Sequence, residues 1–428
     1  MVGLALVLII ILGCAVFLYF KGTLVNAIAT IIIAICASVI AFSFFEVLAN
    51  LIISRSGTGS LLSLVPWAQP LCFALLFILA FAVLQTAALL LTRKPVDLGF
   101  LPERIGRVVC GIFLGLILSG FLLTALQMAP IPNKFPYQRF DGKRNKVLLN
   151  ADGFTTGLFG IISKGSFSGT RSFATLHPEY LDQLFLNRFI TGASIVSGSE
   201  AIEVPTREAI WPAPEGLHKQ IDQLVSELNR RGKLGNESTG ESITMPRLVA
   251  SSYDPMIVRV GIKKSAITAK VAINGGTFTL PQLRLICKRK GYDKDPLAGK
   301  GLNVYPLGYL KAADQIQVSR IVEIERNEFE EDARIKWIDF VFCVPNGFTP
   351  VLLEFKLNNI VQIRPNAILN ADQTPPEPVF FQSSTIKDNI QEPDIPSMPP
   401  SEQSDAPLQR NQLSDISRSV IGEQLEDE

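Results

Sequence analysis

Residues 105–128 form the stretch that most constrains what this chain can fold into. The segment carries no charged side chain after Arg107 and is long enough to cross the hydrocarbon core of a bilayer, which takes about 20 apolar residues. Gly111, Gly115 and Ser119 recur at every fourth position, so they share one helix face and let another helix backbone approach closely. The pattern predicts a transmembrane helix that packs against other helices.

Three more apolar stretches precede this one, at residues 2–20, 24–45 and about 71–91. The first lacks the basic start and the small-residue cleavage site of a signal peptide, so we expect it to be retained as a membrane helix. Gly22 follows it and is expected to lie at a helix-packing position. The sequence therefore predicts an all-α, four-helix transmembrane domain over residues 1–128.

The distribution of basic residues predicts the orientation of these helices. Short cytoplasmic loops carry an excess of Lys and Arg. The loop after the second helix holds only Arg55, whereas the loops after the first and third helices hold Lys21, Arg93, Lys94, Arg104 and Arg107. A basic cluster after the fourth helix opposes this assignment, but long translocated domains largely ignore the rule. We expect a multi-pass inner (plasma) membrane protein with an extracytoplasmic soluble part.

The soluble part divides into three regions by composition. Residues 129–253 begin with a proline-rich stalk and are predicted as a linker with mixed helix and loop. Residues 254–365 contain six or seven β-rich segments separated by turns, which predicts an antiparallel β-sandwich. Residues 366–428 are rich in Pro, Ser and acidic residues and are predicted to form a disordered tail.

The cysteines leave two interpretations open. One cysteine lies in each apolar stretch, where a thiol packs as a small apolar group. Cys287 and Cys343 lie on expected strands and could form a disulfide in an oxidising compartment. The alternative is two buried free thiols.

Two polar residues fall within or at the ends of the apolar stretches. Glu46 closes the second stretch and Gln85 lies in the third, and together they form a possible intramembrane polar site for a proton or ion. The alternatives are that water solvates Glu46 at the interface and that Gln85 links two helices by a hydrogen bond.

No pattern for catalysis or for a cofactor is present. The sequence has no P-loop, no dinucleotide-binding glycine motif and no Cys-x-x-Cys, and two histidines, His177 and His218, are too few for a His-rich metal site. Residues 153–157 (GFTTG) resemble a nucleophile elbow with Thr for Ser, but a surface loop is the better interpretation. We predict no catalytic residue, cofactor or metal. The absence of a basic, aromatic-rich stretch also argues against nucleic-acid binding.

The order of these pieces resembles the colicin V production (CvpA) family of bacterial inner-membrane proteins. The resemblance covers about the first 130 residues and rests on Lys21-Gly22, Ala41-Phe42 and the pair Gly111 and Gly115. One departure is that Glu103-Arg104 lies about a turn before the position of the family's acidic-basic pair. The resemblance implies a link to toxin production and export and to envelope homeostasis. Residues 337–355 are in turn similar to immunoglobulin-like domains.

These observations predict a non-enzymatic scaffold or assembly factor. The expected partners are the lipid bilayer and unidentified envelope or secretion proteins, and the transmembrane helices could also form a homo-oligomer. The alternative is a small-solute or ion channel or transporter subunit with Glu46 and Gln85 along its route. A third class, an envelope hydrolase, would require His177 or His218 for its activity.

Overall fold

The computed structural model of the 428-residue chain divides into two compact units, Met1–Ser384 and Thr385–Glu428, and every residue described below belongs to the first unit. The structure describes residues 2–20, 23–55, 65–91, 100–131, 135–141, 143–163, 172–187, 201–235, 242–248, 250–267, 275–291, 295–330, 333–356, 359–369 and 373–382. Gly22, which the sequence places at a helix-packing position, lies outside these residues.

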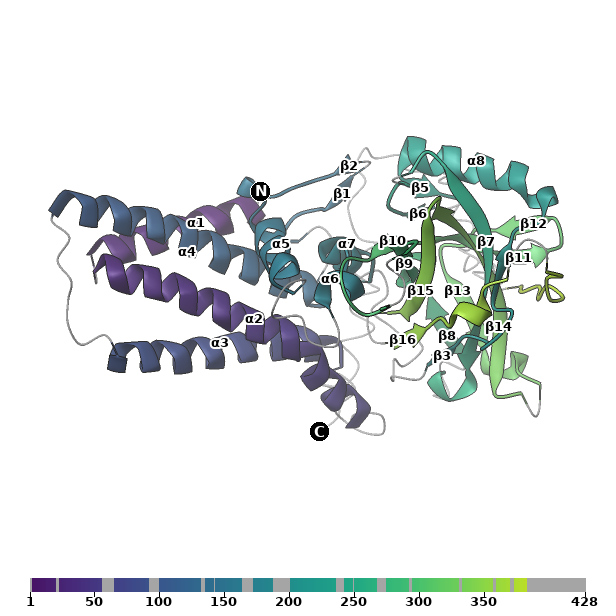
Figure 1. Ribbon diagram of the computed structural model, residues 1–428, viewed down its shortest axis with the longest axis horizontal. Coiled ribbons are helices and arrows are strands. Elements are labelled where there is room, and N and C mark those ends of the chain that lie inside the picture. The colour runs from purple at the N-terminus through teal and green to yellow at the C-terminus, as the bar shows by residue number, and fades with distance from the viewer. Residues whose placement is uncertain are drawn as a thin grey trace, which may run out of the picture. The chain divides into compact units, whose positions relative to one another are not determined.

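Four long apolar helices form the N-terminal part of the structure, as predicted: α1 (Val2–Phe20), α2 (Leu24–Arg55), α3 (Val65–Leu91) and α4 (Phe100–Met128) (Figure 1). Each contains a stretch long and apolar enough to cross a membrane. The third helix begins at Val65, earlier than expected, because a proline is accepted in the first helical turn, where Pro66 lies.

Helices α1 and α4 pack with almost no side chain between their backbones. A Cβ atom on Gly111 would lie 2.5 Å from Ala15 Cα, and one on Gly115 would lie 2.5 Å from Ile11 Cα. Both distances are far shorter than any real Cβ contact. Ser119 lies on the same stripe, fully buried, with its hydroxyl donating to the Leu116 carbonyl at 3.1 Å. Glycine at these two positions therefore sets how closely the two helices approach.

A cluster of aromatic rings fills the space among α2, α3 and α4. The Phe121 ring of α4 stacks on Phe73 and Phe77 of α3, with centroid distances of 4.1 and 4.0 Å. Phe42 of α2 meets Phe73 edge to face at 4.8 Å. The same ring stacks on Phe159 at 4.7 Å, so the aromatic cluster continues out of the spans into the next element.

Three short helices follow the spans: α5 (Ala151–Ile162), α6 (Phe173–Leu176) and α7 (Tyr180–Asn187). They are preceded by the two-residue strands β1 (Phe140–Asp141) and β2 (Lys143–Arg144) and the 3-10 turn η2 (Leu148–Asn150). Helix α5 contacts α4, and α7 contacts both α4 and the 3-10 turn η4 (Leu280–Gln282) of the β region. Helix α7 thus contacts both the spans and the β region, whereas α5 lies against the spans.

The β region contains two larger antiparallel sheets (Figure 1). The six-stranded sheet consists of β12 (Gln315–Gln317), β11 (Pro306–Ala312), β14 (Ile335–Pro345), β7 (Tyr253–Lys263), β3 (Ile202–Glu203) and β4 (Ile210–Pro212). The four-stranded sheet consists of β10 (Leu302–Val304), β9 (Leu283–Arg289), β15 (Phe348–Phe355) and β16 (Asn359–Gln362). Two small pairs, β13 (Val322–Glu325) with β8 (Gly275–Phe278) and β5 (Lys233–Leu234) with β6 (Ile243–Thr244), complete the antiparallel pairing.

The core of the β region includes two buried strands and one face of a helix. Strands β14 and β15 are almost entirely buried along their length and pass from one large sheet to the other through a turn in which Gly347 has a φ of +82°. Helix α8 (Glu215–Arg231) buries Leu217, Ile221 and Leu228 in the same core, at spacings of four and seven residues that keep them on one helix face. The expected antiparallel strands are therefore present.

Two features of the β region differ from the sequence prediction. Strands β3 and β4 and helix α8 arise from residues 129–253, so this stretch contributes to the core and is more than a linker. Residues 366–369 and 373–382, the start of the predicted tail, pack on the sheets, since Phe381 is buried against Tyr309 and the Leu369 amide donates to the Ile210 carbonyl. The remaining tail residues lie outside the described ranges.

The possible disulfide between Cys287 and Cys343 is absent, and both thiols are free. Cys287 lies on β9 and Cys343 on β14, which belong to different sheets. Both side chains are fully buried among apolar neighbours, where a thiol packs as a small hydrophobic group. Burial raises the pKa of Cys343 to about 12, so this thiol stays protonated at neutral pH.

Replacing Gly115 with Ile should destabilise the helix pair, because the new Cβ would overlap the backbone of α1 at Ile11. Overpacking of this kind costs about 1–3 kcal/mol. Thermal unfolding of the full chain in detergent measures the loss. Gly13→Ile on α1 is the matched control, since a Cβ there meets nothing within 4 Å. Equal stability of the two variants would contradict the close backbone contact.

Candidate functional site

A cluster of four buried or half-buried charged groups joins the spans to the β region: Glu46 of α2, His177 after α6, Arg284 of β9 and Glu354 of β15. We call it the charge cluster. Arg284 and Glu354 face each other across two antiparallel strands, and their side chains are 4% and 1% exposed. Charged groups this deeply buried are rare unless they are paired.

His177 is held in one orientation by the segment between α6 and α7. Its backbone N–H donates to Phe173 O at 2.8 Å, and its ring Nδ1 lies 3.1 Å from Gln183 Oε1. The Gln183 amide donates in turn to Pro178 O at 2.6 Å, which leaves its oxygen to accept from Nδ1–H. Nε2 then faces Glu46 Oε1 at 2.7 Å, although the N–H does not point along that line, so the contact is mainly electrostatic.

Arg284 connects the sheet to the same segment. Besides the ion pair with Glu354, its guanidinium donates to the Leu176 carbonyl and to the Asn303 side chain, and the Asn303 amide donates to Pro178 O. Its Nη2 atom lies 3.5 Å from His177 Nδ1. The positive groups of Arg284 and His177 therefore share the space between two carboxylates.

The electrostatics of the cluster follow from burial and from these neighbours. Burial by itself lowers the pKa of His177, but the opposite charge of Glu46, with a contribution from Glu354, raises it above the ordinary value of 6.5. Burial raises the pKa of Glu354, and Arg284 partly offsets this. With both carboxylates ionised, the two negative charges balance Arg284 and a protonated His177.

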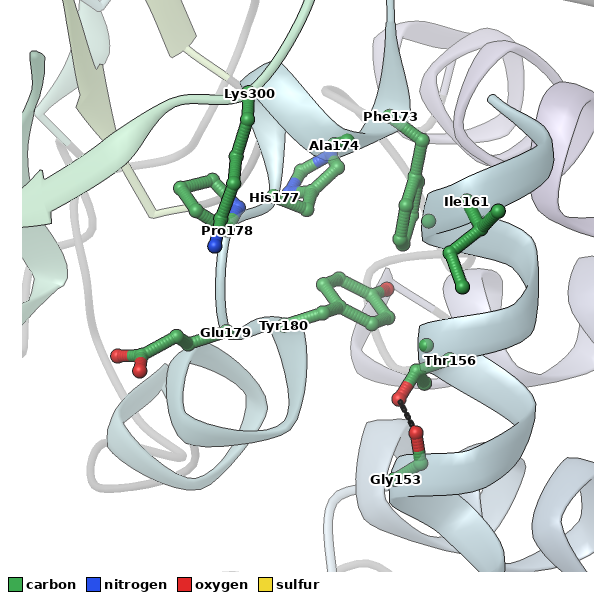
Figure 2. A pocket seen from close by; sticks show the side chains of 12 residues that line it. Gly153, Thr156, Ile161, Phe173, Ala174, His177, Pro178, Glu179, Tyr180 and Lys300 are labelled. Carbon is green, nitrogen blue, oxygen red and sulfur yellow. Dashed lines mark hydrogen bonds between the residues drawn. The ribbon is translucent and has the colours of Figure 1, made fainter. Parts of the chain in front are cut away.

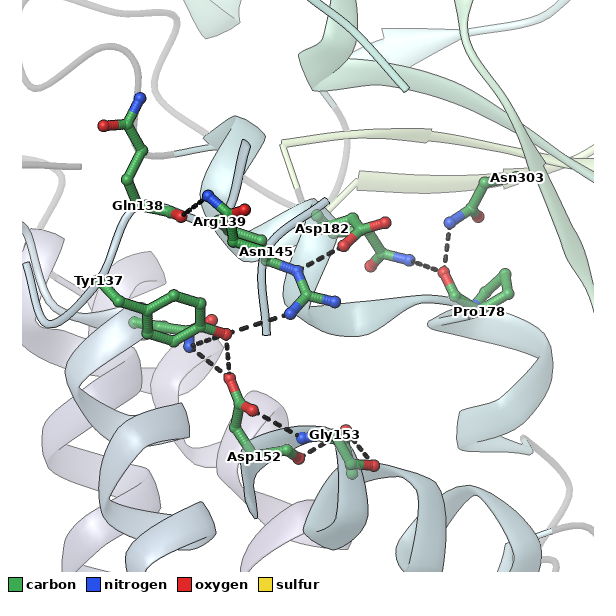
Figure 3. Close-up of polar contacts among 12 residues, drawn as sticks. Tyr137, Gln138, Arg139, Asn145, Asp152, Gly153, Pro178, Asp182 and Asn303 are labelled. Carbon is green, nitrogen blue, oxygen red and sulfur yellow. Dashed lines mark hydrogen bonds and ion pairs between the residues drawn. The ribbon is translucent and has the colours of Figure 1, made fainter. Parts of the chain in front are cut away.

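A second buried polar network connects α4 and α5 to α7 (Figure 3). Asp152 of α5 accepts hydrogen bonds from Tyr137 and, at 2.9 Å, from the Gln127 amide at the end of α4. Arg139 donates to Tyr137 at 3.1 Å and forms an ion pair with Asp182 of α7 at 2.5 Å. Burial and the negative charge of Asp152 raise the pKa of Tyr137 well above its usual range, so the phenol remains a hydrogen-bond donor.

A pocket of about 220 Å³ adjoins the charge cluster, between α5 on one side and the α6–α7 segment on the other (Figure 2). His177 and Tyr180 line one wall, glycines 153, 157 and 160 line the opposite wall, and Lys300 lies at the rim. The Tyr180 ring is buried and extends toward α5, and its hydroxyl has no hydrogen-bond partner within the described residues. The pocket is thus largely apolar with few polar groups.

The geometry of the charge cluster supports electrostatic attachment of the spans to the β region. Within the described residues no group of three or more His, Cys, Asp or Glu side chains could hold a metal ion. The GFTTG sequence at residues 153–157 lies inside helix α5, without the strand that a nucleophile elbow requires before it.

The residues singled out from the sequence lie in different places. Glu46 is 27% exposed and contacts His177. Gln85 lies on α3, where its Oε1 atom is buried and accepts no hydrogen bond from the described residues. Gly111 and Gly115 lie between α1 and α4, and Ser119 is buried one turn further along α4. The structure therefore does not bring Gln85 into the charge cluster.

From the sequence, His177 was considered only for metal binding or hydrolysis, and Arg284, Glu354, Arg139 and Asp182 were missed. A signal was present for two of them, since Arg284 and Glu354 interrupt the apolar runs LRLIC and VLLEF. A charge inside a strand that is otherwise buried needs a partner.

Comparison with protein-family models, with curated proteins and with solved structures finds no match to this chain.

Replacing Arg284 with Met should destabilise the protein by about 3–5 kcal/mol, because Glu354 would be left as an uncompensated buried charge. The double variant Arg284→Met/Glu354→Met should recover most of that loss, since no charge remains buried. Chemical unfolding of the full chain in detergent measures both. Arg231→Met is the control, because the Arg231–Glu227 pair is solvent-exposed and contributes about 0–1 kcal/mol. Equal stability of Arg284→Met and of the double variant Arg284→Met/Glu354→Met would contradict the pairing of Arg284 with Glu354.

Stability should fall as pH rises above 6.5. Because the pKa of His177 is higher in the folded protein, the stability it contributes is complete below pH 6.5 and is lost as pH rises through the raised value. His177→Gln should remove this part of the pH dependence. Unfolding measured between pH 6 and 9 checks it, with His218→Gln, which lies outside the charge cluster, as the control. An unchanged pH profile in His177→Gln would show that another group is responsible.

Proposed function

We propose that this protein is a membrane-anchored, non-enzymatic scaffold or assembly factor whose spans hold the β region in a fixed orientation for partner proteins. The observation that carries the proposal is the charge cluster, in which Glu46 of a span, His177 and the Arg284–Glu354 pair are in contact in series. A scaffold needs a defined position for its recognition surface. Buried ion pairs serve orientation better than stability, because desolvation offsets most of their attraction.

The attachment is reinforced by further bonds between the α6 segment and the β region. The Thr175 hydroxyl donates to Gly299 O at 2.7 Å, and the Ser172 hydroxyl donates to the same oxygen at 3.1 Å. The Gly301 amide donates to Ala174 O at 3.2 Å. Directional contacts at several points resist sliding, which supports a fixed joint.

The finer architecture is also part of the proposal. We interpret the two larger sheets as the layers of a sandwich of immunoglobulin-like type, and the four spans as one bundle. As in the family that the first 130 residues resemble, we place the spans in a bacterial inner membrane, with an envelope or secretion role. The distribution of Lys and Arg over the short loops supports an extracytoplasmic β region.

The alternative, a channel or transporter subunit, draws support from one observation: the Gln85 Oε1 atom is buried in a span without a hydrogen-bond partner in the described part of the chain. Polar groups at membrane depth often mark solute routes. Glu46, the other residue of that hypothesis, lies against His177 instead. The scaffold proposal therefore accounts for more of the polar groups.

Two measurements on the full chain separate the proposals. Liposomes containing the purified protein should show no ion or solute flux above empty liposomes. Cross-linking in cells followed by purification should capture one envelope protein repeatedly and in stoichiometric amounts. Arg284→Met should reduce that capture, whereas the control Arg231→Met should not. Flux that disappears in Gln85→Leu would overturn the scaffold proposal in favour of the channel.

A further inference from the structure

Helix α5 lies against the spans, well inside their length. The Thr155 hydroxyl lies 3.4 Å from the carbonyl oxygen of Ile117, and a Cβ on Gly120 would lie 2.1 Å from that hydroxyl. Gly120 precedes the end of α4 at Met128 by eight residues (128 − 120), which is about 12 Å along a helix axis. Thr155 of α5 therefore lies beside the spanning part of α4.

The later turns of α5 lie beside the apolar stretch of α2. The ring of Phe159 stacks on Phe42 at a centroid distance of 4.7 Å. Phe42 lies in the uncharged stretch of α2 that Glu46 closes, four residues (46 − 42) or about 6 Å before that carboxylate. Both turns of α5 that contact the spans thus lie within the apolar part of the spans.

The outward face of α5 is apolar. Phe154 is 37% exposed, Ile161 is 68% exposed, and Leu158 between them is partly exposed, at spacings of four and three residues that keep all three on one face. The only charged residue of α5, Asp152, is fully buried and bonded to Tyr137 and Gln127. This is the reverse of a helix on a water-exposed surface, where the charged face is outward.

We propose that the outward face of α5 is embedded in the acyl chains of the bilayer leaflet nearest the β region. The inference rests on the four apolar helices spanning a membrane, as in the proposed function. Helix α5 has twelve residues, or about 18 Å, too short to cross a hydrocarbon core of about 30 Å, so it enters without spanning. It adds a fifth membrane-contacting helix to the protein.

The acyl chains are the occupant that the surroundings favour. Helix α5 packs against α1, since Ala151 belongs to the same buried cluster as Val7 and Ile11, and α1 itself exposes the apolar side chains of Leu4 and Leu8. A helix satisfies its own backbone hydrogen bonds, so it can enter hydrocarbon without the cost that a loop would incur. The pocket beside His177 shares Gly157 and Ile161 with this face and so borders the same lipid.

The test places an environment-sensitive fluorophore on single cysteines in a full-length, cysteine-free background reconstituted into liposomes that contain lipids with quenchers at known depths. Ile161→Cys should give blue-shifted emission and strong quenching by the chain-attached quenchers. Ile9→Cys, an exposed position on α1, is the positive control, and Ala313→Cys, an exposed position between β11 and β12, is the water-exposed control.

Each outcome tests either the embedding of α5 or its premise, that the four apolar helices span a membrane. Quenching at Ile9 but water-like emission at Ile161 would overturn the embedding of α5 and leave the membrane placement intact. Absence of quenching at both positions would overturn the placement of the spans as well. A cross-link between two chains through Ile161→Cys would identify a second copy as the occupant instead. If the cysteine-free chain does not fold, Phe154→Trp in the natural sequence replaces the fluorophore. Brominated lipids should then quench more tryptophan fluorescence in this variant than in the unsubstituted chain.

Discussion

Burial of charge at the junction between the spans and the β region is the constraint on which the rest of the structure depends. Removing a carboxylate or a guanidinium from water costs several kcal/mol per ion, and only close partners with further hydrogen bonds offset it. Arg284 meets that requirement with a carboxylate, a backbone carbonyl and an amide. The strand register that sets Arg284 opposite Glu354 and the turn that presents Leu176 must therefore form together.

The spans depend on the opposite kind of contact. Glycines on α4 allow backbone approach, and stacked phenylalanines fill the remaining space. Such contacts are close but carry little directional information outside the helix pair itself. The directional contacts between the spans and the β region therefore lie at the polar junction, where Glu46 is the contribution of the spans.

Much of the fold could be predicted from local sequence because its signals are local. Uncharged stretches of about 20 residues predict membrane helices, and apolar runs between turns predict strands such as β14 and β15. Strands β3 and β4 were missed because two or three residues carry no periodicity, and only pairing with β7 defines them. Phe381 looked like part of a solvated tail because the cavity that receives it is formed by residues far away in the sequence.

The candidate site was harder, because its members are brought together from distant parts of the chain. Glu46 and His177 are separated by 131 residues (177 − 46), and a carboxylate at the end of a span is usually solvated, so water was the better expectation for it. Arg284 and Glu354 are recognisable as buried charges from the apolar residues around them. Their pairing follows only once the antiparallel register of β9 and β15 is known.

The α6–α7 segment is what makes the two polar networks act as one joint. His177, which precedes α7, belongs to the charge cluster, and Asp182 within α7 binds Arg139 of the second network. One short segment is therefore held by both networks. Apolar packing alone would leave such a segment free to settle in several positions of similar energy, whereas each ion pair has a single good geometry. A displacement of the sheets would then reach α2 and α4 through this segment, since both networks end on those spans.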